Sequence, residues 1–303
     1  MKIILAGGTG FIGRAFREKL LEAGYEVIVL TRLSSQDSGE KMSRESFAAW
    51  DGKSAGDWAA HLDGADAVIN LTGENIAAKR WTPAQKQKIL SSRVDATRAI
   101  VNAIEQAQRK PALLINASAV GYYGDAADQE LSEASPKGEG FLAETCEAWE
   151  AEARRAERFG VRVVLARLGP VLGEKGGMLA KMLPPFLLFM GAPLGTGRQW
   201  ISWVHREDVV GAFLFILGRR DFSGPVNVTS GTPVTMKEFC RRLAGMLHRP
   251  CWPPLPSFFL KGVMGEMVAI VLSSQKVLPL RLLKEGYRFR FADLSEALAA
   301  SLR

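Results

Sequence analysis

Short apolar runs alternate with longer segments of helical period through the first half of the chain. The apolar runs do not alternate between polar and apolar positions, which is typical of strands buried on both faces of a parallel sheet. We therefore predict an α/β protein with a doubly wound parallel Rossmann sheet. The runs are 2–6, 26–30, 67–71, 113–117 and 161–166, and the helical segments are 11–23, 83–108 and 139–158.

The pattern changes after residue 169, where the chain becomes rich in Gly, Pro, Phe and Trp. A helix near 206 and a strand at 225–228 briefly restore the alternation of strands and helices, and a mostly helical region follows. Thr235 stands three residues before Glu238, as in a helix capping box. We expect a Rossmann core with a smaller, interleaved, mostly helical lobe. The core is assigned to 1–170 and completed by about 204–230, and the lobe to 171–203 and 231–303.

Composition is that of a globular protein, with 303 residues of which 47% are hydrophobic and 23% charged. The net charge is +7, but like charges do not run beyond adjacent pairs. A nucleic-acid binder more often concentrates its basic residues in a stripe. We expect no nucleic-acid partner, and the surplus charge suits a small phosphate-bearing ligand or solubility.

Cysteine and histidine usage argues against covalent or metal stabilisation. Cys146, Cys240 and Cys251 form no C-x-x-C pair, which favours a reducing compartment. The three histidines lie far apart without clustered carboxylates, so we expect no metal site. The chain opens on an apolar run with no room for a secretory signal, and its longest apolar stretch, 182–197, contains prolines. A cytoplasmic protein without a membrane partner is expected.

A glycine-rich turn follows the first apolar run and opens the first helix. It reads Gly7-Gly8-Thr9-Gly10-Phe11-Ile12-Gly13. Glycines at these spacings allow a tight turn, let backbone N–H groups approach a pyrophosphate and let the helix pack closely on the sheet. We predict dinucleotide contacts from Gly7, Thr9, Gly10, Phe11, Ile12 and Gly13. The alternative is a glycine turn used only for packing.

The residues at the end of the second apolar run indicate which of two dinucleotides the chain binds. An NAD-binding protein usually carries an acidic residue there to hold the ribose 2′-hydroxyl. This chain instead reads Thr31-Arg32-Leu33-Ser34, and Arg32 offers a planar, charged fork suited to a 2′-phosphate. We therefore favour NADP(H) over NAD(H) as the cofactor. The alternative is that Arg32 is a solvated loop residue.

Several further motifs resemble one family. The glycine turn, 70–76, 80–82, 92–93, 117–124, 167–173 and 203–208 are similar to epimerase-family proteins of the atypical extended short-chain dehydrogenase/reductases, some of which are labelled cell-division inhibitors. Segments 277–279 and 286–289 resemble the family's C-terminal domain of unknown function. The resemblance implies an NADP(H)-binding Rossmann core and leaves the substrate open. From these motifs we expect further cofactor contacts at Asn70, Leu71, Thr72, Gly73, Arg93 and Ser118.

The chain departs from this superfamily at its catalytic Tyr-x-x-x-Lys, in which the lysine lowers the tyrosine pKa and holds the nicotinamide ribose. None of the four tyrosines has a lysine four residues later. Phe141 and Thr145 occupy the two key positions of the motif. Ala119 stands in the slot of the usual serine, with Ser118 just before it. The standard proton-transfer groups are therefore missing.

Two groups of residues are candidates for the active site, one for catalysis in place of the missing groups and one for recognition of the ligand. Ser118 ends a parallel strand, where ligands bind in such sheets, and Tyr122 and Tyr123 follow it, so these three are the catalytic candidates. Their alternatives are a turn cap and aromatic packing. The recognition candidates are Arg80, Trp81, Arg198, Trp200 and His205. The alternative for the tryptophans is an aromatic core between the lobes, and the alternative for His205 is a structural role at the start of a helix.

The leading hypothesis is an NADP(H)-binding, epimerase- or reductase-like oxidoreductase that transfers hydride on an unknown small molecule without the usual Tyr-x-x-x-Lys. The alternative is a non-catalytic NADP(H)-responsive regulator or scaffold that acts through a protein partner. A conventional nucleotide-sugar epimerase ranks third, because that reaction needs the base that is absent.

Overall fold

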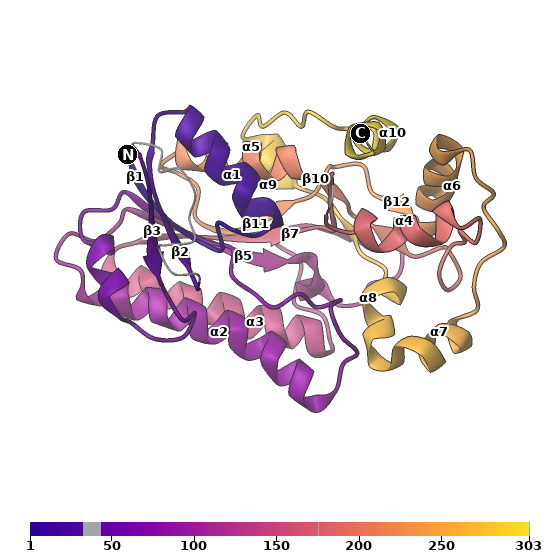
Figure 1. Ribbon diagram of the computed structural model, residues 1–303, viewed down its shortest axis with the longest axis horizontal. Helices are drawn as coiled ribbons and strands as arrows, with labels where there is room; N and C mark the ends of the chain where they lie inside the picture. The colour runs from indigo at the N-terminus through magenta and orange to yellow at the C-terminus, as the bar shows by residue number, and fades with distance from the viewer. Residues whose placement is uncertain (33–43, 175, 303) are drawn as a thin grey trace.

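A seven-stranded parallel sheet forms the centre of the protein, which confirms the predicted α/β Rossmann architecture. The computed structural model describes residues 1–32, 44–174 and 176–302. The strand order is β11-β7-β5-β4-β1-β2-β3, so the direction of winding reverses between β1 and β4 (Figure 1). The strands are β1 (Lys2–Ala6), β2 (Glu26–Thr31), β3 (Glu45–Ala49), β4 (Ala67–Asn70), β5 (Leu113–Ala119), β7 (Arg162–Leu168) and β11 (Gly224–Val228).

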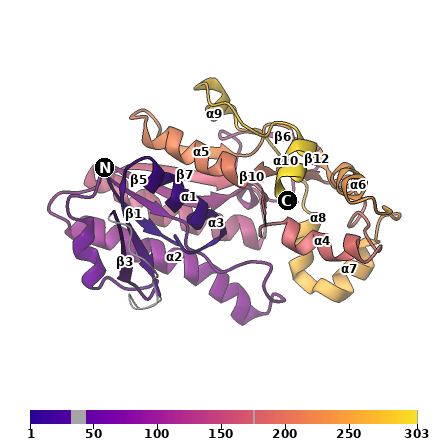
Figure 2. The ribbon, with the colours of Figure 1, turned by 45° about the horizontal axis from the view of Figure 1, so that its top comes forward.

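Helices cover both faces of the sheet, which explains why the strands lack alternation. α1 (Phe11–Glu22) and α5 (Arg206–Leu217) lie on one face, and α2 (Pro83–Gln106) and α3 (Phe141–Arg154) on the other (Figures 1 and 2). Within β1, Ile3 and Leu5 belong to the core on the first face, whereas Ile4 and Ala6 belong to the core on the second. Each strand therefore buries successive side chains on opposite sides.

Two local features differ from the prediction. The sequence pattern does not indicate a strand at β3, yet this segment pairs in parallel with β2 at the edge of the sheet. Of its five residues only Ala48 is buried, and the strand includes Glu45 and Ser46, so the apolar run that marks the central strands is absent. The predicted helix 139–158 also ends earlier, at Arg154, and a 3-10 turn over Arg155–Phe159 follows.

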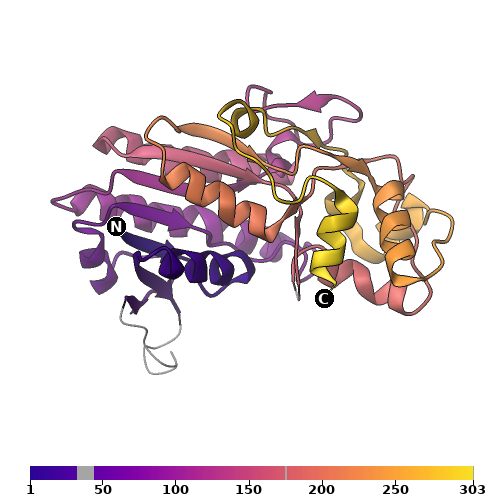
Figure 3. The ribbon, with the colours of Figure 1, turned by 90° about the horizontal axis from the view of Figure 1, so that it is seen from above.

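A second lobe lies at one end of the sheet and has its own apolar core (Figure 3). Trp203, Phe239 and Leu298 are fully buried in this core. Thr235 caps α6, because its hydroxyl oxygen accepts a hydrogen bond from the Glu238 N–H at 3.2 Å, as its spacing predicts. The helices of this lobe are α4 (Leu179–Leu187), α6 (Met236–Leu247), α7 (Ser257–Met264), α8 (Ala269–Leu272) and α10 (Leu294–Ser301).

The last segment of the chain returns to the core. β13 (Lys276–Val277) pairs in parallel with β6 (Glu130–Leu131). The Ser274 N–H donates to Asp125 at 3.0 Å, and the Gln275 side chain donates to the Gly124 carbonyl at 2.8 Å. Core and lobe therefore share hydrogen bonds. The remaining elements are β8 (Val171–Leu172), β9 (Trp200–Ile201), β10 (Val204–His205), β12 (Val234–Thr235), α9 (Leu280–Lys284) and the 3-10 helices Asp57–Leu62, Val120–Tyr123 and Gly265–Val268.

His205 joins α5 to the lobe. It is 3% exposed, and its Nδ1 accepts a hydrogen bond from the Glu207 N–H at 3.3 Å, which caps the helix. Its ring centroid lies 4.0 Å from that of Phe291. Burial lowers the pKa of His205 to about 4, helped by the charges of Arg206 and Arg290 and opposed by Glu207. The histidine therefore stays neutral in the folded protein at neutral pH.

This burial predicts a pH-dependent loss of stability. The unfolded chain binds a proton at His205 below about pH 6.5, whereas the folded protein does so only near pH 4. The free energy of unfolding should therefore fall as the pH drops through that window. A His205→Asn variant keeps a capping side chain without the titration. Between pH 6.5 and 5, denaturant unfolding should show the wild type losing about 1–2 kcal/mol more than the variant. Parallel stability curves for the two proteins would contradict this assignment.

Candidate cofactor site

The glycine turn sits between β1 and α1 and leaves no room for side chains. Gly7 has a φ of +80°, and a Cβ there would lie 2.8 Å from the Leu71 carbonyl carbon. A Cβ on Gly13 would lie 2.2 Å from the Gly7 oxygen. The Gly7 carbonyl accepts a hydrogen bond from the Gly10 N–H at 3.0 Å. Only glycine at these positions permits the observed approach of α1 to the strand.

The N-terminus of α1 fits a dinucleotide diphosphate. Its N-cap is Gly10, which has no side chain to accept hydrogen bonds from the first-turn N–H groups. These donors and the positive end of the helix dipole face the carboxyl edge of the sheet, where anionic ligands bind in this architecture. The glycine turn thus provides a cradle of backbone donors that a Cβ would fill.

Other residues of the turn are occupied by packing. The Thr9 carbonyl accepts a hydrogen bond from Arg14 Nε at 2.7 Å. The Phe11 ring lies against the loop before α4, where a Cβ on Gly176 would come within 2.3 Å of it, and the Arg206 guanidinium stands 5.0 Å from the ring. Ile12 packs against the core. The predicted cofactor contacts of Phe11 and Ile12 therefore depend on their backbone N–H groups.

Arg32 lies on the other side of the turn from β4. It directly follows β2 and its side chain is exposed at the carboxyl edge of the sheet. Residues 33–43, including Leu33 and Ser34 of the motif, lie outside the described part of the chain.

A buried amide network shapes the loop after β4. Asn70 is fully buried, and its Nδ2 donates to Asn116 at 2.7 Å and to Thr97 at 3.0 Å. Its Oδ1 accepts a hydrogen bond from the Thr72 N–H at 3.1 Å. This network places Leu71 and Thr72 against Gly7. Asn70 therefore acts on the predicted cofactor loop by fixing its backbone.

Arg93 of α2 reaches the same loop. A Cβ on Gly73 would lie 3.1 Å from the Arg93 Cζ, so the guanidinium packs directly against the glycine backbone. Its Nη1 donates to the Ile89 carbonyl at 2.9 Å, and its Cζ stands 5.1 Å from the Trp149 ring. Burial lowers the pKa of Arg93. The glycine turn, the loop after β4 and Arg93 thus meet at one edge of the sheet.

Ser118 and Tyr123 belong to a buried ionic network. Ser118 donates to Glu150 Oε1 at 2.7 Å, and Arg167 donates to both oxygens of that carboxylate at 2.8 Å. Arg167 also donates to the Tyr123 hydroxyl at 3.0 Å, and this hydroxyl donates to Asn227 at 2.7 Å. Burial raises the pKa of Tyr123 despite Arg167. Burial also opposes the charge on Arg167, but Glu150 keeps the pKa of Arg167 above its ordinary value.

The sequence reasoning missed this network as a unit. A signal was present, because Arg167 follows the apolar run 163–166 of its strand and a buried arginine needs a carboxylate partner. The partner Glu150 lies on a separate helix, 17 positions earlier. Its identity therefore depends on how α3 packs against the sheet.

Tyr122 differs from its neighbour. It is only partly buried, its ring lies 3.5 Å from the Arg167 Cζ, and it meets the Tyr123 ring edge-on at 5.4 Å. Across the described residues, no hydrogen bond engages the Tyr122 hydroxyl. Of the three catalytic candidates, Tyr122 is therefore the one whose hydroxyl forms no hydrogen bond within the described part of the chain.

Aromatic packing fills the place of the missing Tyr-x-x-x-Lys. Phe141 begins α3, and its ring centroid lies 5.1 Å from that of Trp81 and 5.3 Å from Lys86 Nζ. The Thr145 hydroxyl donates to the Phe141 carbonyl at 2.7 Å. Neither position supplies a base or a cation.

The five predicted recognition residues do not form one cluster. Arg80 and Trp81 lie together before α2, where Arg80 donates to the Gly262 carbonyl of α7 at 3.3 Å. Lys86 forms an ion pair with Glu266 beside this contact. Trp200 is held elsewhere, by a hydrogen bond to Asp128 at 2.8 Å. Arg198 is exposed and His205 is the buried helix cap described above.

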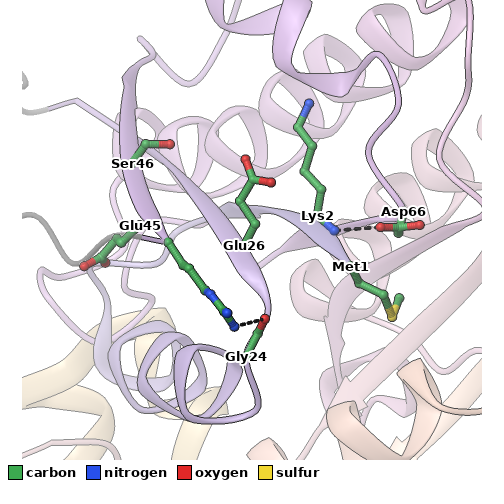
Figure 4. A pocket seen from close by; sticks show the side chains of 8 residues that line it. Met1, Lys2, Gly24, Glu26, Glu45, Ser46 and Asp66 are labelled. Atoms are coloured by element: carbon green, nitrogen blue, oxygen red, sulfur yellow. Dashed lines mark hydrogen bonds between the residues drawn. The ribbon is translucent and has the colours of Figure 1, made fainter.

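A separate open hollow of about 430 Å³ lies at the amino ends of β1, β2 and β3 (Figure 4). The Lys2 N–H donates to Asp66 at 2.6 Å across it, and Arg44 donates to the Gly24 carbonyl at 2.8 Å. Ligands of parallel sheets bind at the opposite, carboxyl edge. The glycine turn, and not this hollow, is therefore the candidate site.

The described residues contain no group of three side chains that could together bind a metal ion. None of their helices is both long and apolar enough to cross a bilayer. All three cysteines are free thiols.

Comparison with known proteins agrees with this geometry. The model of the NAD dependent epimerase/dehydratase family matches residues 3–229, and that of a domain of unknown function, DUF1731, matches residues 255–301. The epimerase family protein YfhF of Bacillus subtilis is 39% identical over 99% of this chain and 97% of its own length. The chloroplastic SDR39U1 homologue of Arabidopsis thaliana is 38% identical over the whole chain and 87% of its own length.

A solved structure extends the likeness to three dimensions. The human epimerase family protein SDR39U1, determined with NADPH, has a TM-score of 0.86 and 33% identity, and the match covers both chains completely. The family model spans most of the chain, and the relatives match it almost end to end, which confirms the resemblance found in its motifs. The chain is therefore a member of the NAD-dependent epimerase/dehydratase family, with a C-terminal DUF1731 domain.

Proposed function

We propose that the protein binds NADP(H) and serves hydride transfer on a small molecule held between the core and the second lobe. The observation that carries this proposal is the glycine cradle, whose backbone donors at the start of α1 have no side-chain cap. The human relative determined with NADPH supports the choice of cofactor. More distant structures with the same fold were determined with NAD, so the preference for NADP(H) depends on Arg32.

Different residues of the chain bind different parts of the cofactor. Bound NADPH supplies a hydride. The first-turn N–H groups of α1 hold its diphosphate, and Arg32 binds its 2′-phosphate. The Asn70 network keeps Leu71 and Thr72 in place beside the turn.

Proton transfer in this proposal depends on positioning rather than on a tyrosine–lysine pair. Tyr122 donates a hydrogen bond to the reacting ligand, and water carries the proton. Ser118 and Tyr123 act on it indirectly, because their network fixes Arg167 against the Tyr122 ring. Arg80 and Trp81 are the recognition residues nearest the contact between the core and α7. Roles of Arg198, Trp200 and His205 in recognition, and a cytoplasmic location, stay predictions from the sequence.

A second candidate function is a non-catalytic NADP(H)-responsive regulator or scaffold. The observation that favours it is that Phe141 and Thr145 fill the catalytic positions with packing groups. A pull-down with and without NADP(H) tests it. A stoichiometric partner captured only with NADP(H) supports the regulator, and an unchanged set of partners counts against it.

Replacing Arg32 by alanine should remove the preference for the phosphorylated cofactor. Charge-assisted hydrogen bonds to the 2′-phosphate contribute about 1.5–3 kcal/mol, so the affinity for NADPH should fall about 10- to 100-fold. The affinity for NADH should be unchanged. Isothermal titration calorimetry measures both. Equal losses for the two cofactors would show that Arg32 does not select the phosphate.

Replacing Tyr122 or Tyr123 by phenylalanine should distinguish a catalytic role from a structural one. With a panel of carbonyl and enone substrates, Tyr122→Phe should lower kcat at least ~10-fold and leave NADPH affinity unchanged. Tyr123→Phe removes the buried hydrogen bonds that the hydroxyl makes to Asn227 Oδ1 and Arg167 Nη1, so it should lower the free energy of unfolding by about 1–3 kcal/mol. If the wild type oxidises no NADPH with any substrate in the panel, the regulator becomes the leading function.

A further inference from the structure

We propose that the second lobe docks on a lipid bilayer that contains anionic headgroups, through exposed apolar side chains at the end of α4, at Trp252 and on α7. We call this set the apolar surface. Each of its side chains is more than half exposed, and Phe258 reaches 76%. Large exposed hydrophobic residues that gather on one part of a protein are typical of an interaction surface. The apolar surface consists of residues 187–190, Trp252, Phe258, Phe259 and Val263.

Two distant segments of the chain bring the apolar surface together. The segment before α7 runs alongside the segment after α4. The Trp252 N–H donates to the Gly191 carbonyl at 2.9 Å, and the Leu255 N–H donates to the Pro193 carbonyl at 2.8 Å. The exposed residues of both segments therefore lie along one end of the molecule, opposite β3 (Figures 1 and 2).

The turn after α4 holds a phenylalanine where glycine is usual. The Phe189 N–H donates to the Phe186 carbonyl at 3.0 Å. The Met190 N–H donates to the Pro185 carbonyl at 2.8 Å, which completes a Schellman turn. Phe189 has a φ of +62°, in the left-handed region that favours glycine. Its side chain is 54% exposed, so core packing does not offset this strain. A contact outside the chain gives the ring a role that the fold does not.

The charges that accompany the apolar surface are positive. Residues 175–206 and 239–265, which supply the whole surface, contain no Asp or Glu and four Lys or Arg residues each. Lys181 on α4 and Lys261 on α7 are exposed, and the Arg249 Cζ stands 4.3 Å from the Phe189 ring. None of these three cations forms an ion pair with another described residue. The next acid along the chain, Glu266, is paired with Lys86. Exposed apolar groups among unpaired cations match the interface of an anionic bilayer.

A bilayer suits the arrangement of the apolar surface better than a protein partner does. The exposed side chains come from a helix end, a loop and a short helix rather than from one element. A protein would need a surface shaped to all three, whereas the headgroup region of a bilayer accepts side chains one by one. Trp252 is of the residue type that prefers this region. Lying on a bilayer requires no spanning helix, so the proposal departs from the sequence-based expectation of no membrane partner without conflicting with the described helices.

Co-sedimentation with vesicles tests the proposal. The wild type should sediment with vesicles of equal parts phosphatidylcholine and phosphatidylglycerol, and far less with phosphatidylcholine alone. High salt should weaken the binding, because it screens the attraction between exposed charges. Phe258→Ser should lower partitioning into the mixed vesicles at least ~5-fold, because it removes an aromatic side chain that would leave water. Lys261→Glu should lower it too, because it places a negative charge beside the headgroups.

Phe189→Gly distinguishes membrane contact from folding. Glycine suits a φ of +62°, so this variant should melt at the temperature of the wild type or above it. Its partitioning into the mixed vesicles should nevertheless fall at least ~5-fold. Leu283→Ser is the matched control, because Leu283 is 48% exposed on α9, on a different part of the molecule (Figure 2). Its vesicle binding should equal that of the wild type.

The remaining outcomes overturn the proposal. They are a wild type that stays in the supernatant with both kinds of vesicle, variants that sediment like the wild type, and equal sedimentation with both kinds of vesicle. A dimer in light scattering that Phe258→Ser and Phe189→Gly convert to a monomer, with no vesicle binding, assigns the apolar surface to a second copy of the chain instead. Thermal melts report whether each variant is folded. If Phe258→Ser fails to fold, Phe189→Gly decides.

Discussion

The contact between Gly13 and the Gly7 carbonyl sets the distance between α1 and the first strand. No side chain fits in it, so the helix starts directly at the carboxyl edge of the sheet with its first N–H groups uncapped. Every other part of the site is arranged around this point. Arg32 lies on one side, and the loop that Asn70 holds against Gly7 lies on the other.

Two buried polar networks then decide which groups are left for a ligand. The Asn70 network fixes a loop and a tryptophan, and the Glu150–Arg167 network engages Ser118 and Tyr123. Buried polar groups are costly unless they are paired, and these networks satisfy theirs internally. Within the described residues, Arg93 and Tyr122 have donors that the networks do not use. In the proposed function their neighbours hold them in place for a ligand.

The central strands and the glycine turn were predictable because their signals are local. A strand such as β1, buried on both faces, shows an unbroken apolar run, and glycine spacing follows from the geometry of one turn. β3 was missed because an edge strand is covered on fewer sides and tolerates residues such as Glu45. The pairing of Arg167 with Glu150 and the separation of Trp200 from Trp81 depend on packing between distant segments. No spacing in the sequence encodes such contacts.

The return of the last segment to the core has a consequence for how this protein folds. Two family models divide the sequence, but the second includes β13, whose partner β6 lies in the first. A chain cut between the two matches would leave the Leu131 carbonyl and the Asp125 carboxylate without the N–H donors of Leu278 and Ser274. Neither segment is therefore an independent module. We therefore expect them to unfold as a single cooperative unit, in which the C-terminal residues complete the core that is synthesised first.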